Sequence, residues 1–146
     1  MENASYGLPD EILIIICVFV IAIFVLFLNT LYDTLKNVQI ENRKISPGEV
    51  WITLTPLFGL IWQFIMVIRI SESLKLEFQE RGIKINEQKP GYSVGICYCI
   101  LCCFTMFPII GILATIGGIV FMIKYWVKIN NYNKLLKLQS KIVNSF

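Results

Sequence analysis

The chain has 146 residues, of which 56% are hydrophobic and 16% charged, and its net charge is +3 at pH 7. An ordinary soluble domain has about 45–50% hydrophobic and about 25% charged residues. A body of this size leaves much of its surface in water and cannot bury so much apolar material. The composition therefore argues against a soluble enzyme, a disordered tail and a disulfide-stapled secreted domain.

Three blocks of the sequence carry no charged residue: 12–32, 50–68 and 91–123. A helix that crosses the apolar core of a bilayer needs about 20 residues, because each residue rises about 1.5 Å. The blocks hold 21, 19 and 33 residues, so the first two match one crossing and the third exceeds it. We therefore expect an all-α integral membrane protein with a single membrane domain over residues 1–146.

The first helical segment is expected over residues 10–32. Its N-terminal flank holds Glu2, Asp10 and Glu11 but no basic residue, and no small-residue cleavage site follows the apolar run. A secretory signal peptide has both a basic flank and such a site. We therefore expect this segment to stay in the protein as a membrane anchor.

The second segment is expected over residues 47–81, with a break at 56–59. Residues 46–49 (Ser-Pro-Gly-Glu) have the pattern of a capping box with proline at the first helical position. Pro56 and Gly59 interrupt the helix soon afterwards. Such a break fits either a kink in a helix that crosses the membrane or the tip of a re-entrant loop. The length of the uncharged block favours the crossing.

The third block predicts two helices, over residues 91–107 and 109–141. Pro108 removes a helical hydrogen-bond donor, and Gly111 permits a sharp turn. We expect a tight hairpin of the third and fourth helices at these residues. The fold class is thus all-α with four helical segments, of which the second is kinked or re-entrant.

The 13 basic residues fall in three stretches, with three in 36–44, five in 69–89 and five in 124–141. Lys and Arg beside membrane segments mark the cytoplasmic side. A crossing second segment gives four spans, with both termini inside and 10 basic residues inside against 3 outside. A re-entrant one gives three spans, with the N-terminus outside and all 13 inside. Both threadings place the C-terminal tail in the cytoplasm, and the charge count favours the second.

The two halves of the sequence share a layout. A Pro-Gly pair opens each half, at residues 47–48 and 90–91, and a Pro-x-x-Gly motif interrupts each, at 56–59 and 108–111. Parallel interruptions are typical of duplicated, transporter-like architecture with a midplane site. Gly and Pro also recur by chance in apolar helices, because both are common there.

Histidine is absent from the sequence, and the three apolar blocks hold no Asp, Glu, Lys or Arg. Histidine is the usual general base and the commonest metal ligand. Proton relays and coupled transporters generally need ionisable groups within the membrane. We therefore expect a protein that is not an enzyme.

Four of the five cysteines lie between residues 97 and 103. Cys99, Cys102 and Cys103 are candidates for a thiolate site that binds a soft cation such as Cu(I). Thiolates are disfavoured in hydrocarbon without a positive charge or a metal. Gly95, Cys99 and Cys103 also recur every four residues, as small residues do where helices approach closely. We favour the packing role, and we expect no metal and no cofactor.

Gln63, Thr53 and Thr55 are polar residues inside the second apolar block. The amide of Gln63 needs hydrogen-bond partners in hydrocarbon. These side chains could line a pore or bind a substrate, although a hydrogen bond to a neighbouring helix is the commoner role. We favour the structural role for Gln63.

The segments that leave the membrane are amphipathic, and Glu77 can pair with Arg81 one helical turn later. Their apolar stripes could dock on a partner protein or lie on the lipid surface, where lysines attract anionic headgroups. The stripes consist of Ile70, Leu74 and Phe78 in one segment and of Tyr125, Ile129, Tyr132 and Leu136 in the other. Attraction to anionic headgroups explains the positive net charge more simply than nucleic-acid binding does, so nucleic acid is not an expected partner.

Three stretches carry a resemblance to a known group of proteins. They are residues 47–51 (Pro-Gly-Glu-Val-Trp), 56–64 with its Pro-Leu-Phe and Trp-Gln-Phe, and 125–129 (Tyr-Trp-Val-Lys-Ile). Over residues 44–136 the chain resembles a widespread family of small bacterial inner-membrane proteins without an assigned function. The resemblance implies a bacterial origin and transfers no catalytic or ligand residues.

These observations predict a non-enzymatic scaffold or accessory subunit in the bacterial inner membrane. Its partners would be the lipid bilayer and a membrane or cytoplasmic protein that meets the amphipathic segments. The alternative is a homo-oligomeric pore or passive transporter for a small solute or ion, with Gln63, Thr53 and Thr55 along its path.

Overall fold

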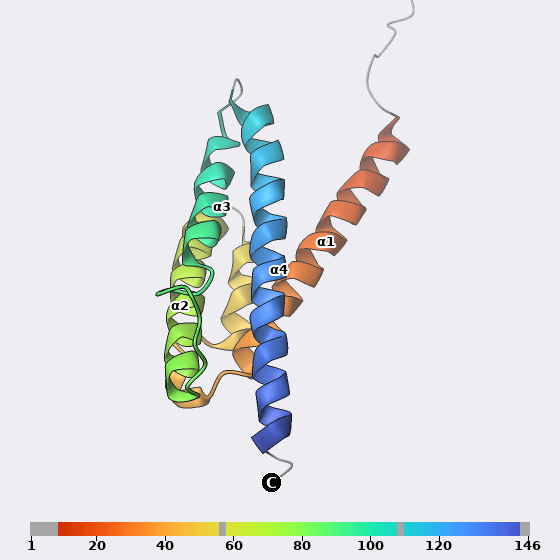
Figure 1. Cartoon of the computed structure of the whole chain (residues 1–146). Coiled ribbons are helices and arrows are strands. Elements are labelled where there is room, and N and C mark those ends of the chain that lie inside the picture. The colour runs from red at the N-terminus through yellow and green to blue at the C-terminus, as the bar shows by residue number, and fades with distance from the viewer. Residues whose placement is uncertain (1–8, 56–57, 108–109, 144–146) are drawn as a thin grey trace, which may run out of the picture.

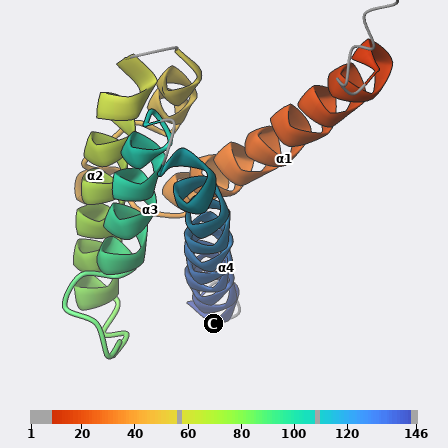
Figure 2. The same cartoon turned by 90° about the horizontal axis from the view of Figure 1, so that it is seen from above.

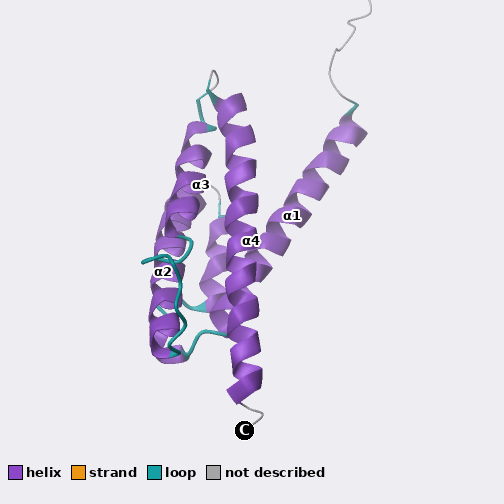
Figure 3. Ribbon diagram, in the orientation of Figure 1, coloured by secondary structure: helices purple, strands orange, loops and turns teal. Residues whose placement is uncertain are grey.

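A computed structural model of the chain describes residues 9–55, 58–107 and 110–143. Every element in these ranges is helical, which confirms the all-α fold (Figure 3). The predicted breaks at Pro56 and Pro108 lie outside the described residues. In chain order the elements are α1 (Asp10–Lys36), η1 (Ile40–Asn42), η2 (Pro47–Leu54), α2 (Phe58–Glu80), α3 (Tyr92–Phe104) and α4 (Gly111–Val143).

α2, α3 and α4 lie roughly along one direction and alternate in sense, whereas α1 crosses them at an angle (Figures 1 and 2). α1 runs toward the end of the molecule at which α2 and α4 also finish, whereas α3 runs the opposite way. The first half of α1 leans away from the other helices (Figures 1 and 2). All residues from 10 to 22 are exposed, so this half of α1 packs on no other described element.

The second apolar block folds back on itself between η2 and α2. The two helices lie side by side and run in opposite directions (Figures 1 and 2). Nε1 of Trp62 donates a hydrogen bond to the carbonyl oxygen of Glu49 (2.9 Å), and the hydroxyl of Thr53 contacts the sulfur of Met66 (3.5 Å). A continuous helix would separate residues 13 positions apart by about 20 Å. The kinked crossing helix is therefore wrong.

The segment folds back instead of continuing as one long helix, and its first arm, η2, is short. It is a 3₁₀ helix of eight residues, and a 3₁₀ helix rises about 2 Å per residue. The arm therefore extends about 16 Å, roughly half of the apolar thickness of a bilayer. The segment is thus a helical hairpin, which is the shape that the re-entrant alternative expects.

α3 and α4 form the second hairpin, as predicted. They pack most closely at Gly95, where a Cβ atom would lie 2.5 Å from Cγ1 of Val67 on α2 and 2.9 Å from the ring of Tyr125 on α4. α3 has 13 residues, which span about 20 Å. A glycine at this position lets three helices meet at one point.

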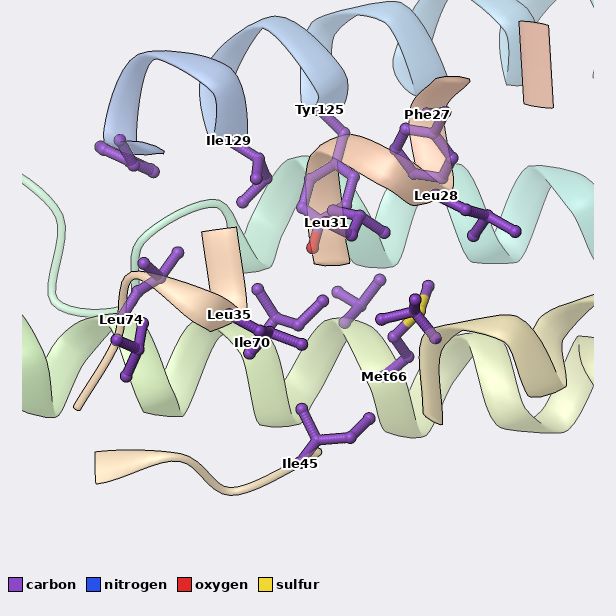
Figure 4. Packing of buried hydrophobic residues seen from close by; sticks show 14 of the residues in the cluster. Phe27, Leu28, Leu31, Leu35, Ile45, Met66, Ile70, Leu74, Tyr125 and Ile129 are labelled. Carbon is purple, nitrogen blue, oxygen red and sulfur yellow. The ribbon is translucent and has the colours of Figure 1, made fainter. Parts of the chain in front are cut away.

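The hydrophobic core lies where α1, α2, α3 and α4 converge (Figure 4). Phe27 stands at its centre, with its ring in edge contact with the rings of Tyr98, Tyr125 and Trp126 at centroid distances of 6.1–6.2 Å. The core continues from there into the end of the molecule that carries the charged residues. Its fully buried aliphatic members include Leu28, Leu31, Leu35, Val50, Met66, Val67, Ile70, Leu74, Ile129 and Leu136.

The two amphipathic stripes are part of this core, which corrects their expected role as docking surfaces. Phe78 of α2 and Tyr132 of α4 stack edge to face at 5.4 Å, and each stripe is buried along its length. The stripes are buried because α2 and α4 converge with the second half of α1, whose Leu31 and Leu35 lie between them (Figure 4). Neither stripe remains for a partner protein or for lipid.

The most apolar parts of the chain are instead the most exposed. Two helices among the described residues, α1 and α4 (to Ile142), are long and apolar enough to cross a membrane. Only 11% of the most apolar window of α1 and 22% of that of α4 is buried. A water-soluble fold buries such windows, so this inversion of burial suggests an apolar solvent.

Candidate functional site

We call the part of the molecule formed by the uncharged blocks 12–32, 50–68 and 91–123 the uncharged half, and the rest the charged half. An open pocket of about 340 Å³ lies in the uncharged half. It is bordered by the middle of α1, the end of η2, the start of α2 and the end of α3. Among the described residues that line it, none is charged. They are Phe24, Thr53, Leu54, Thr55, Gly59, Leu60, Gln63, Tyr98, Cys102 and Thr105.

Gln63 forms the deepest polar contact of this pocket. Its amide nitrogen Nε2 donates a 2.6 Å hydrogen bond to the hydroxyl oxygen of Tyr98 on α3. Both residues are buried, at 4% exposure each. A hydrogen bond between helices satisfies polar groups that hydrocarbon cannot. Gln63 thus has the structural partner that the sequence analysis favoured, while it also lines the pocket.

The described residues that flank the two hairpin turns approach each other in the same way. Their sequences share Thr-x-x-Pro-x-x-Gly, at residues 53–59 and 105–111. The backbone carbonyl of Thr53 occupies the place where a Cβ on Gly59 would stand, and the carbonyl of Thr105 would lie 3.0 Å from a Cβ on Gly111. Glycine is needed at the end of each turn because the backbone itself approaches so closely. The internal repeat therefore extends from the sequence to the structure.

These turns bring together the polar residues that the sequence singled out. Gln63, Thr53 and Thr55 line one pocket, and the second turn adds Thr105. Sequence reasoning missed Tyr98, which lies 35 residues from Gln63. The shared Thr-x-x-Pro-x-x-Gly pattern could have indicated that Thr105 stands in a position equivalent to that of Thr53.

The cysteines do not share one environment. Cys99 is buried, Cys102 lines the pocket and Cys103 is exposed. No group of three or more His, Cys, Asp or Glu residues suited to a metal ion occurs in the described part of the chain. Gly95 faces Val67 of α2 and Tyr125 of α4, and Cys99 is a buried member of the core, whereas Cys103, the third residue of the small-residue stripe, is exposed.

A second polar cluster lies in the charged half, around the fully buried carboxylate of Glu77. Arg81 pairs with it at 2.5 Å, which confirms the predicted i, i+4 pair. The other carboxylate oxygen accepts hydrogen bonds from the backbone N–H of Gln39 (3.0 Å) and from the side-chain amide of Asn42 (2.8 Å). Both charges and the surrounding donors are thus satisfied, as a buried ion pair requires.

The same cluster fastens three distant segments together. Arg81 donates hydrogen bonds to the carbonyl oxygens of Asn37 (3.2 Å) and Leu136 (3.3 Å), and the side-chain amide of Asn37 donates to that of Asn133 (2.7 Å). The 37–42 loop, the end of α2 and the tail of α4 therefore meet at one end of the molecule. Segments joined by hydrogen bonds in this way do not fit the four-span threading, which separates the 37–42 loop from the tail of α4.

An ion pair holds the loop between α2 and α3 against α4. The carboxylate of Glu87 pairs with the ammonium group of Lys128 and accepts a 3.0 Å hydrogen bond from the backbone N–H of Gly91. Partial burial acts to raise the pKa of Glu87, but these two partners outweigh it and hold the pKa below its usual value of 4.5. Glu87 is therefore ionised at neutral pH.

Comparisons with known proteins found no matching family model, no matching curated protein and no matching solved structure.

Proposed function

We propose that this chain is an integral protein of the bacterial inner membrane that acts without catalysis, as a scaffold or an accessory subunit. The proposal rests on the inversion of burial. The windows of α1 and α4 with the highest hydropathy are 11% and 22% buried, while the buried core lies where the four helices converge and continues into the half that carries the basic residues. In this proposal lipid chains surround the uncharged half of the molecule, and water surrounds the half that carries the basic residues.

The polar contacts support one threading of this protein. The cluster around Glu77 joins the 37–42 loop, the end of α2 and the tail of α4. All 13 basic residues then lie on the cytoplasmic side, as the bias of Lys and Arg in membrane proteins requires. The N-terminus lies outside, and the hairpin of η2 and α2 enters the membrane from the cytoplasm and returns.

The first half of α1 is the docking face of this scaffold. The amphipathic stripes of α2 and α4 are buried in the core, whereas residues 12–21 of α1 pack on no other described element. An apolar helix that makes no contacts within its own bundle is free to pack against a transmembrane helix of another protein through complementary shape. The occupant is therefore an apolar transmembrane helix of a partner subunit.

Alanine substitutions on α1 test this proposal, because they keep the segment apolar and alter its shape. We expect Ile14→Ala, Val18→Ala and Ile21→Ala together to dissociate complexes that the full chain forms in mild detergent. The matched control is Ile112→Ala, Leu113→Ala and Ile116→Ala on the exposed face of α4. If both triple variants retain the complexes, or both lose them, the α1 docking face is refuted.

A passive transporter or homo-oligomeric pore is the second candidate. The observation in its favour is the convergence of Gln63, Thr53 and Thr55 on one pocket between two equivalent hairpin turns. Conductance of proteoliposomes, compared between the natural chain and Gln63→Leu, tests this function. A current that Gln63→Leu changes supports the pore, and the absence of current at every voltage contradicts it.

A further inference from the structure

The uncharged pocket beside α1 has the chemistry of a binding site. Four polar side chains from distant parts of the sequence line it, although the apolar blocks contain few such residues. They are Thr53, Thr55, Gln63 and Thr105. Polar side chains are costly in an apolar environment unless they have partners, so their convergence on one open pocket calls for an occupant with a polar group.

The lining excludes a charged occupant. Among the described residues that line the pocket, none carries a formal charge. A charged group placed there would lose its hydration without gaining an opposite charge, and this is unfavourable in a medium of low dielectric constant. The occupant is therefore neutral.

The hydrogen bonds already formed leave two groups for the occupant. Gln63 donates its amide nitrogen to Tyr98, and its carbonyl oxygen accepts no hydrogen bond from any described residue. The hydroxyl of Thr105 donates to the carbonyl oxygen of Cys102 (2.6 Å). Thr55 is exposed and borders the pocket. A hydroxyl group on the occupant could thus donate to Gln63 and exchange a hydrogen bond with Thr55.

The route into the pocket leads from the apolar side. Phe24 of α1 borders the pocket and is half-buried, while residues 10–22 of α1 are exposed where the helix leans away (Figure 2). The pocket volume of about 340 Å³ is at the lower end of the range for ligand pockets. It accommodates a polar head and the first carbons of a chain, and the rest of the chain would lie along α1.

We propose that this pocket binds a neutral amphiphile, namely an apolar chain that ends in a hydroxyl group, with Gln63 and Thr55 as the groups that recognise the hydroxyl. The inference rests on the proposed insertion of the uncharged half into the bilayer. It does not depend on the scaffold or transporter activity.

Photolabelling tests the site in proteoliposomes of phosphatidylcholine. The probes are a long-chain alcohol with a diazirine in its chain and the carboxylic acid of the same chain, both at about pH 9.5, because the bilayer raises the pKa of the acid and a high pH keeps it ionised. We expect the alcohol to label peptides within 53–63 and 98–105 in a saturable manner, and unlabelled monooleoylglycerol to compete. The acid should label these peptides several-fold less.

Thr55→Val and Gln63→Leu each remove one recognition group, and we expect roughly a fivefold loss of saturable labelling for each, as one hydrogen bond allows. Thr115→Val is the matched control, because Thr115 lies in the apolar part of α4 and donates to the carbonyl oxygen of Gly111 (2.7 Å), away from the pocket. The exposed Thr55 keeps the test valid if Gln63→Leu does not fold.

Equal labelling by both probes, labelling that spreads evenly over the exposed helices, or labelling unchanged in both variants would overturn the proposal. Failure of the proposed membrane insertion gives a different result, because the unmodified chain would then not float with the vesicles.

Discussion

The uncharged half and the charged half of this protein are stabilised in different ways. In the uncharged half, helices pack closely at Gly95, polar contacts are few and many large apolar side chains are exposed. In the charged half, the core closes around a buried ion pair. The apolar sequence thus makes much of the surface as well as part of the core, whereas the apolar stripes of the amphipathic segments are buried.

The largest expected effect is in the charged half, at the buried ion pair. Glu77→Ala leaves the guanidinium of Arg81 and the backbone N–H of Gln39 without their acceptor, so we expect the free energy of unfolding to fall by about 3–5 kcal/mol. Thermal unfolding in detergent micelles, followed by circular dichroism, measures this loss. Glu72→Ala is the control on the same helix, because Glu72 is half-buried and stands outside the cluster. Equal losses in the two variants would refute the role of the cluster.

The uncharged half should be most sensitive at Gly95. A Cβ there would lie 2.5 Å from Cγ1 of Val67 and 2.9 Å from the ring of Tyr125, neither of which can give way easily. We expect Gly95→Ala to cost about 1–3 kcal/mol of unfolding free energy. In Gly118→Ala the nearest atom, on Leu101, lies at an ordinary 3.8 Å, so this variant should be neutral or slightly stabilising. Similar losses in both would contradict close packing at Gly95.

The hydrogen bond between Gln63 and Tyr98 should contribute less to the free energy of unfolding than the ion pair of the charged half does. We expect a coupling of about 1 kcal/mol in a double-mutant cycle of Gln63→Leu and Tyr98→Phe, measured by unfolding in detergent. A coupling as large as the loss in Glu77→Ala would remove the distinction between the two halves.

The smallest effect should come from Glu87, whose carboxylate is partly exposed to water. Its pKa in the folded protein lies below the usual 4.5, so the folded form favours the ionised carboxylate. The stabilisation is complete above pH 4.5 and is lost as the pH falls through the lowered pKa. Unfolding midpoints from pH 6 to pH 3 should therefore fall slightly more for the natural chain than for Glu87→Gln. Parallel curves would show that the contact with Lys128 contributes nothing.

The sequence predicted those features that depend on neighbouring residues. The helical hairpin of α3 and α4 and the pair of Glu77 with Arg81 follow from local patterns, because a Pro-x-x-Gly motif and an i, i+4 spacing act within one or two turns of chain. The all-α class follows from the length of the uncharged blocks.

Features that depend on distant residues were not predictable in this way. An apolar stripe indicates a covered face, but its spacing does not say what covers it, so the mutual burial of Phe78 and Tyr132 was missed. The return of η2 was ambiguous because Pro56 fits a kink as well as a turn. The partner of Gln63 is 35 residues away on another helix, and the pocket exists only once α1, η2, α2 and α3 have packed.

Labelling of single cysteines from each side of the membrane is the most direct test of the proposed threading, in which the N-terminus lies outside and the basic segments lie in the cytoplasm. In a chain whose five cysteines are replaced by alanine, new thiols are placed at Asp10, Ile40 and Ser140, which are all exposed. In inner-membrane preparations of known orientation, an impermeant maleimide should label position 10 from the outside and positions 40 and 140 from the cytoplasmic side. Labelling of positions 40 and 140 from opposite sides, or of position 10 from the cytoplasm, would contradict the account.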